Sequence, residues 1–138
     1  MIDKINIRVY AIYLNEKNEL MALDERYAGE KLIKLPGGGL EFGEGTIECL
    51  HREFAEELNL KIEVLEHFYT QEDFLVSRFR ENEQLLTIYY TVNILNLDEL
   101  KILDESIENV KWISLHEENP LPLPIDKIVF EKLKEKLF

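Results

Sequence analysis

The sequence predicts an α/β fold in which helices pack on the faces of a mixed β-sheet. Two segments, residues 46–58 and 125–137, repeat apolar residues at helical spacing. The other periodic segments alternate apolar and polar residues or are rich in β-branched side chains, as strands are. Their order, β-β-loop-α-β-β-β-α, inserts one helix among hairpins, and this order favours a mixed sheet covered by helices.

The first two predicted strands occupy residues 5–14 and 19–23. In the first, alternate apolar residues share one face: Ile5, Ile7, Val9, Ala11 and Tyr13. The polar turn at 15–18 connects the two strands, so we expect a hairpin. A short apolar segment at 32–35 then leads through Pro36 into three consecutive glycines.

Residues 46–58 form the first predicted helix, along which one apolar stripe runs: Ile47, Leu50, Phe54 and Leu58. Thr46 is the expected N-cap, because its hydroxyl can accept a hydrogen bond from a free amide of the first turn. Asn59 is expected to end the helix, since Asn tolerates the left-handed conformation that is common there. Three strands follow, at 62–69, 84–95 and 110–113. The closing helix buries Ile125, Val129, Leu133 and Leu137.

The composition limits the functions that the chain can carry. Its 138 residues are expected to form one domain, residues 1–138. The net charge is −12, with 22 Glu among 28 acidic residues, so the protein should repel polymeric nucleic acid and anionic membranes. No segment resembles a signal peptide or a membrane span. The single cysteine, Cys49, cannot form an internal disulfide, and a cytoplasmic protein is therefore expected.

Three carboxylates share one side of the helix predicted at 46–58. A turn of about 100° per residue places Glu53, Glu56 and Glu57 beside the apolar stripe. In a glutamate-rich chain, such a cluster is most often a solvated face. Here the glycines at 37–39 precede it and let the main chain approach a ligand closely. A glycine-rich turn beside clustered carboxylates suits Mg²⁺, which prefers oxygen ligands and would let this acidic protein bind a phosphate compound.

The spacing of these residues resembles the Nudix box, G-x5-E-x7-R-E-U-x-E-E-x-G-U, in which U is apolar. The matching residues are Gly38, Glu44 and the run Arg52-Glu53-Phe54-Ala55-Glu56-Glu57-Leu58-Asn59-Leu60. Asn59 replaces the last glycine and can adopt the same backbone conformation. With this chain's composition, the glycine and charged positions would coincide by chance with odds on the order of 10⁻⁴. The resemblance implies a Nudix-like α/β/α sandwich with a mixed central sheet over essentially the whole chain.

The resemblance also implies roles for individual residues. It implies a Mg²⁺ site, with Mn²⁺ as a substitute, whose ligands are the carboxylates of Glu53, Glu56 and Glu57 and the backbone carbonyl of Gly37 or Gly38. Arg52 resembles the residue that orients Glu53. Glu44 resembles a loop brace or an outer ligand near the metal.

The implied reaction is hydrolysis of the pyrophosphate bond in a nucleoside diphosphate linked to another group X. Water attacks a phosphorus atom, Mg²⁺ neutralises charge on the oxygens, and a carboxylate takes the proton. Glu53 is the favoured base, and three carboxylates later in the chain compete with it: Asp104, Glu105 and Glu108. Among these we keep Glu105 as the loop candidate. No second motif identifies X.

Basic and aromatic residues elsewhere are candidates for substrate contacts. The polar segment 71–83 contains Arg78, Arg80, Phe74 and Phe79. Arginines beside aromatic rings can stack on a base or bind a distal phosphate, although an ordinary hairpin tip has the same composition. Three more basic residues could reach phosphates from the first strands: Arg8, Arg26 and Lys34. Taken alone, each of these is typical of a protein surface.

Two other functional classes compete with the enzyme. A catalytically silent Nudix domain could act as a nucleotide-sensing or regulatory module, but such a domain would be expected to lose box carboxylates, and all are present here. A plain interaction module would make the box an accident. The expected partners are a small nucleotide-type substrate and, through sheet edges, a second copy of the chain in a homodimer.

Overall fold

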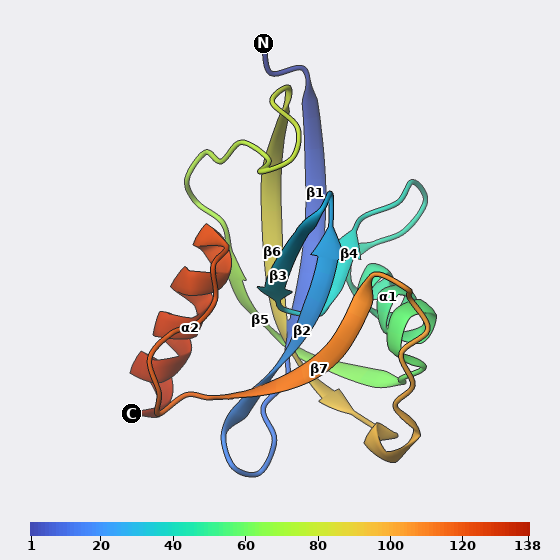
Figure 1. Cartoon of the computed structure of the whole chain (residues 1–138), viewed down its shortest axis with the longest axis vertical. Helices are drawn as coiled ribbons and strands as arrows, with labels where there is room; N and C mark the ends of the chain where they lie inside the picture. Colours follow the sequence, from blue (N-terminus) through green and yellow to red (C-terminus); the bar gives the residue numbers. More distant parts are fainter.

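The computed structural model describes all of residues 1–138 and contains seven strands and two α-helices (Figure 1). In chain order the elements are β1 (Lys4–Ile12), β2 (Glu19–Tyr27), β3 (Glu30–Lys34), β4 (Gly37–Gly39), α1 (Thr46–Leu58), β5 (Ile62–Thr70), β6 (Glu83–Ile94), β7 (Ile107–Ser114) and α2 (Pro124–Leu137). A short 3₁₀ turn, η1 (Leu97–Glu99), precedes β7. Neither α-helix is long and apolar enough to cross a membrane.

The strands form two sheets, one mixed and one antiparallel. The four-stranded sheet has the order β4-β1-β6-β5, in which β1 runs parallel to β6 and the other pairs are antiparallel. The three-stranded sheet has the order β3-β2-β7 and is antiparallel throughout. The predicted mixed sheet is thus confirmed, and Figure 1 shows α1 and α2 on opposite sides of the strands.

Two apolar clusters hold these layers together, one under each helix. Neighbouring residues of β1 point to opposite faces, so Val9 packs in the cluster with α1 whereas Tyr10 packs in the cluster with α2. Leu23 and Ala22 of β2 divide in the same way. Because both faces of these strands are covered, buried residues follow one another there without polar alternation.

The predicted hairpin between the first two strands forms only at its turn, where the Asn15 amide donates to the Glu19 carbonyl and the Met21 amide donates to the Tyr13 carbonyl, both at 3.0 Å. β1 and β2 lie in different sheets, and an isolated bridge between Leu14 and Leu20 connects the segments. β2 continues to Tyr27 and turns back into β3 through Ala28 and Gly29, both of which have positive φ. Sequential strands pair only about two-thirds of the time, and alternation within one strand does not report its partner.

The structure confirms the bounds of α1 but changes its buried face and its N-cap residue. Asn59 ends the helix with a φ of 58°, in the left-handed region, as predicted. Gly45 rather than Thr46 precedes the first turn, and the Gly45 amide donates to the Glu48 carboxylate at 3.0 Å. Ile47 is 46% exposed, and Cys49 is buried instead, because the helix turns that side toward β4.

A buried carboxylate anchors the closing helix α2. Asp126 is 2% exposed and accepts hydrogen bonds from the Tyr89 hydroxyl and from the Leu35 amide at 3.3 Å. Leu35 comes directly before Pro36 and the glycines, so this bond fixes the chain where it enters β4. Leu137, predicted on the buried side, lies in the last turn of α2 and is 42% exposed.

We expect Tyr89→Phe to destabilise the fold by about 1–3 kcal/mol, because the buried Asp126 would lose its hydroxyl donor. Burial raises the pKa of Asp126 and the Tyr89 hydroxyl lowers it, so the variant moves that pKa further upward. A carboxyl whose pKa is raised in the folded protein contributes its full stabilisation below the pKa that it has in the unfolded chain, about 3.9. That contribution is lost as the pH rises.

The loss in the free energy of unfolding caused by Tyr89→Phe should therefore be larger at neutral pH than at a pH of about 4. Urea unfolding of both proteins at the two pH values measures the difference in the free energy of unfolding. An equal deficit at both pH values would show that the hydroxyl does not act through the charge of Asp126.

Candidate functional site

Three glycines bring the main chain of β4 against β1 and α1. β4 pairs with β1 through Gly37, Gly38 and Gly39. Gly37 has a φ of 144°, and a Cβ added there would lie 2.1 Å from the carbonyl oxygen of Val9. A Cβ added to Gly38 would lie 2.5 Å from the Cδ of Glu53. Glycine at these two positions therefore lets the strand lie directly against the Glu53 carboxylate.

Arg52 gathers the box carboxylates around one guanidinium. Its Nε and Nη2 donate to the two oxygens of Glu44 at 2.9 and 2.7 Å. Its Nη1 donates to Glu53 at 2.9 Å and to Glu56 at 3.3 Å, and its Nη2 also donates to the Gly39 carbonyl at 2.9 Å. The Arg52 side chain thus ties the loop after β4 to two carboxylates in the C-terminal half of α1.

These contacts make the carboxylates electrostatically different from one another. The hydrogen bonds from Arg52 lower the pKa of Glu44 to about 2, so Glu44 stays ionised. Burial raises the pKa of Glu57 well above its ordinary value, and so does the hydrogen bond that protonated Glu57 donates to the Glu53 carboxylate. Two carboxylates in one poorly solvated place resist double ionisation unless a cation lies between them. The Glu53–Glu57 pair is therefore where an added cation would relieve the most repulsion.

A hollow beside this cluster, which we name the carboxylate hollow, offers the donors that a hard divalent cation prefers. Twelve residues line it and none is hydrophobic; they include all the predicted metal ligands, Gly37, Gly38, Glu53, Glu56 and Glu57. This oxygen-rich lining fits Mg²⁺ chemically. The side chains are not gathered into a coordination sphere, since no three His, Cys, Asp or Glu groups converge closely enough to hold an ion.

Of the three later carboxylates, only Asp104 lines the carboxylate hollow. The Leu103 amide donates to the Glu57 carbonyl at 2.8 Å, which holds this loop against the end of α1. Glu105, the loop candidate from the sequence, is exposed and lies outside the hollow. Glu108 forms ion pairs with basic side chains of β2 and β3. The sequence could not separate neighbours on an irregular loop, because no periodicity indicates which side chain faces the site.

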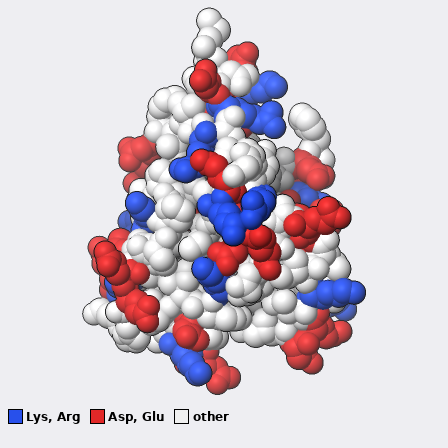
Figure 2. All heavy atoms as spheres, in the orientation of Figure 1, with Lys and Arg blue, Asp and Glu red and all other residues white.

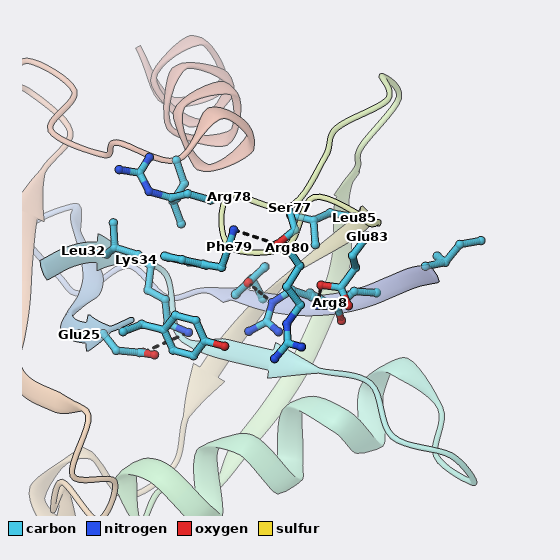
Figure 3. Close-up of a pocket in the computed structure, with 15 residues that line it drawn as sticks. Arg8, Glu25, Leu32, Lys34, Ser77, Arg78, Phe79, Arg80, Glu83 and Leu85 are labelled. Carbon is cyan, nitrogen blue, oxygen red and sulfur yellow. Dashed lines mark hydrogen bonds and ion pairs between the residues drawn. The ribbon is translucent and has the colours of Figure 1, made fainter. Parts of the chain in front are cut away.

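A second hollow, which we name the arginine hollow, adjoins the first and is lined from both sheets and from the segment 71–83 (Figure 3). It encloses about 360 Å³. Five of the six predicted substrate residues line it: Arg8, Lys34, Arg78, Phe79 and Arg80. Phe74 is 66% exposed and lies outside it. Arg26 also lies outside both hollows and pairs with Glu108 at 3.5 Å.

The boundary between the two hollows combines two residues that the sequence singled out, Arg8 and Lys34, with Glu25, which it did not. Arg8, Lys34 and Glu25 line both, and the Lys34 Nζ lies 3.1 Å from a Glu25 oxygen with both side chains largely buried. The Arg8 Nε donates to the Tyr10 hydroxyl at 2.6 Å. The ring of Tyr27 packs edge-on against the ring of Phe79, with the two centroids 4.6 Å apart. Glu and Tyr are ordinary strand residues, so only their partners in space reveal this role.

Comparisons with known proteins agree with this fold. Residues 4–133 match the family described as the NUDIX domain. The nucleoside triphosphatase NudI of Enterobacter sp. (strain 638) is 29% identical over 93 residues, which make up 64% of this chain. The matched region spans 66% of that protein, slightly less than two-thirds of its length.

Solved structures resemble the chain over nearly its whole length. The MutT protein from Methanosarcina mazei Go1 superposes with a TM-score of 0.79 at 21% identity, covering 99% of this chain and 97% of that one. A NUDIX hydrolase from Nitrosomonas europaea also has a TM-score of 0.79, at 18% identity, with 96% of this chain and 90% of that one covered. At such identities the likeness establishes a shared fold.

Proposed function

This chain belongs to the Nudix family, and we propose that it is a Mg²⁺-dependent hydrolase that cleaves the pyrophosphate bond of a nucleoside diphosphate linked to another group X. The observation that carries the proposal is the bonding of Arg52 to Glu44, Glu53 and Glu56 beside an oxygen-lined hollow. All four box carboxylates are present and Arg52 holds three of them, which favours an enzyme over a silent nucleotide-sensing domain.

The metal site would use four ligands from residues that line the carboxylate hollow: the carboxylates of Glu53, Glu56 and Glu57 and the carbonyl of Gly37 or Gly38. When bound, Mg²⁺ or Mn²⁺ supplies positive charge that stabilises the phosphate oxygens as the pyrophosphate bond breaks. Arg52 limits the rotation of Glu53, so that carboxylate keeps one orientation toward β4. Glu53 is the preferred acceptor for the proton of the attacking water.

The remaining polar residues would bind and orient the substrate. Arg8 and Lys34 border both hollows, so they are placed to contact the phosphates. The arginine hollow would receive the part of the substrate that lies beyond the cleaved bond. Asp104 would assist Glu53 from the loop side, because its Oδ1 is occupied by the Ser106 amide and hydroxyl at 2.8 Å while its Oδ2 has no protein donor.

We expect Asp104→Asn to lower kcat by about 10- to 100-fold, because it removes a negative charge and a proton acceptor from the carboxylate hollow. Asparagine keeps the oxygen that Ser106 bonds, so the loop should keep its shape. Glu105→Gln is the matched control on the adjacent, exposed residue, and its kcat should stay near that of the unchanged protein. Steady-state kinetics compares the two, and a larger loss from Glu105→Gln would reverse the assignment.

A turnover screen tests the proposed function. The protein is incubated with nucleoside triphosphates, nucleotide sugars, ADP-ribose and dinucleoside polyphosphates, with Mg²⁺ or with EDTA, and the released phosphate species are identified. We expect cleavage of at least one pyrophosphate compound with Mg²⁺ and none with EDTA, while simple phosphomonoesters remain intact. Failure to cleave any compound of the panel with Mg²⁺ would refute the proposal.

A further inference from the structure

The five arginines of the chain fall into two groups. Arg26, Arg52 and Arg78 each have a carboxylate oxygen within 3.5 Å. Arg8 and Arg80 form no ion pair, although the chain has 28 acidic residues and only 16 basic ones. Acidic side chains are prominent on the face shown in Figure 2. Both unpaired arginines line the arginine hollow. Two unpaired guanidinium groups in one hollow of so acidic a protein indicate a site for an anion.

The direction of the side chains separates Arg80 from its neighbour Arg78. Figure 3 shows Arg8 and Arg80 extending toward the same part of the hollow, whereas Arg78 extends away from them. Arg78 is engaged with Glu30 at 3.1 Å. Arg8 uses its Nε to donate to the Tyr10 hydroxyl, which leaves its two terminal nitrogens without a hydrogen-bond acceptor in the protein.

The other charges of the hollow do not fully neutralise this pair. Lys34 and Glu25 neutralise each other at 3.1 Å. The remaining carboxylate, Glu83, accepts a hydrogen bond from the Asn6 side chain at 3.4 Å and has no basic partner. Glu83 offsets one of the two arginines, so the hollow keeps a net excess of one positive charge, which a bound anion would neutralise.

Building on the proposed function, we propose that Arg8 and Arg80 bind an anionic group of the substrate, a phosphate or a carboxylate, that is separate from the two phosphates of the cleaved bond. Arg8 borders both hollows, whereas Arg80 borders only the arginine hollow. The anion would thus lie on the side of Arg8 that is remote from the box carboxylates. Arg80 is then a specificity-determining residue, and substrates whose group X is neutral have a lower kcat/KM than those whose group X is anionic.

Binding without turnover tests the anion site itself. Inorganic pyrophosphate is titrated into the metal-free full-length protein, and the Nε–Hε NMR signals of its arginines are followed. We expect the signals of Arg8 and Arg80 to shift with one common Kd, and Arg80→Gln to raise the Kd that Arg8 reports by about tenfold. Arg26→Gln is the matched control, because Arg26 lies outside both hollows, and it should leave that Kd unchanged. An unmoved Arg80 signal, or an unchanged Kd in Arg80→Gln, would overturn the proposal.

Two matched substrate pairs then identify the source of the anion. A nucleoside triphosphate is compared with its diphosphate, and a nucleotide linked to a sugar acid is compared with the same nucleotide linked to the neutral sugar. We expect Arg80→Gln to lower kcat/KM by about tenfold for the member with the additional anion in at least one pair, and Arg80→Lys to recover part of that loss.

The failing outcomes of these assays are distinct from one another. An equal loss of kcat/KM for both members of both pairs, or no loss for any substrate, would refute the anion site while Mg²⁺-dependent turnover persists. The absence of turnover for every substrate, with the NMR response intact, would refute the proposed hydrolase instead.

Discussion

Replacing Glu53 or Glu57 by glutamine is expected to lower kcat by about 10²- to 10⁴-fold while the protein stays folded. Glutamine keeps the shape of the side chain but removes the charge that a metal ligand or a proton acceptor needs. Glu53 contacts Arg52 at 2.9 Å and lies against Gly38, so its amide would remain in place without its function.

The stability of Glu57→Gln should move in the opposite direction from its activity. Burial and Glu53 raise the pKa of Glu57, which means that the fold disfavours the ionised form of this carboxyl. A neutral glutamine removes that cost, so metal-free Glu57→Gln should unfold at the same temperature as the unchanged protein or at a higher one. In the unchanged protein, the raised pKa of Glu57 makes the free energy of unfolding fall as the pH rises above the pKa of this carboxyl in the unfolded chain. Glu57→Gln should not show this fall.

Steady-state kinetics with Mg²⁺ and thermal unfolding followed by circular dichroism measure the two effects. Glu63→Gln is the control, because Glu63 is an exposed glutamate on β5 and lines neither hollow. Near-normal turnover in both Glu53→Gln and Glu57→Gln would show that the site has been assigned to the wrong residues.

The three consecutive glycines should respond to alanine in three different ways. Gly37→Ala places a Cβ 2.1 Å from the Val9 carbonyl oxygen at a φ of 144°, and backbone cannot move aside cheaply. We expect a loss of about 3 kcal/mol or more in the free energy of unfolding. Gly38→Ala places its Cβ 2.5 Å from the Glu53 Cδ, which belongs to a side chain that can rotate. We expect Gly38→Ala to remain folded and to lose about 100-fold in kcat, because Glu53 is displaced.

Gly39→Ala is the matched control for this series. A Cβ there would meet its nearest atom, the Arg8 Nη1, at 3.5 Å, which is an ordinary contact. Its free energy of unfolding should stay within about 0.5 kcal/mol of the unchanged value, with kcat little affected. Urea unfolding and steady-state kinetics on the three variants separate these outcomes. If Gly38→Ala and Gly39→Ala had the same kcat and the same free energy of unfolding, the steric role assigned to Gly38 would be wrong.

Local sequence was sufficient for α1 and for the box residues that it carries. The helix has the predicted bounds because the apolar spacing and the left-handed Asn59 are properties of adjacent residues. The fixed geometry of a helix then places Glu53, Glu56 and Glu57 on one side. Arg52 lies four positions before Glu56, so their contact also follows from helix geometry.

Features that depend on distant partners could not be predicted in the same way. β2 pairs with β3 and β7 rather than with β1, and alternation within β2 carries no information about that choice. β4 consists of three glycines, which have low strand propensity, and it exists because β1 offers a partner. The arginine hollow joins residues from β1, from β3 and from the segment 71–83, and no spacing along the chain relates them.

In the proposed function, the box carboxylates hold a divalent cation. Titrating the metal-free protein with Mn²⁺, and following the signal of the free ion by electron paramagnetic resonance, measures this directly and needs no substrate. We expect saturable binding that Mg²⁺ competes away, with affinity reduced by about tenfold or more in Glu57→Gln and unchanged in Glu63→Gln. If the unchanged protein shows no saturable binding, or if Glu57→Gln binds Mn²⁺ as tightly as the unchanged protein does, the metal site proposed at α1 and β4 is contradicted.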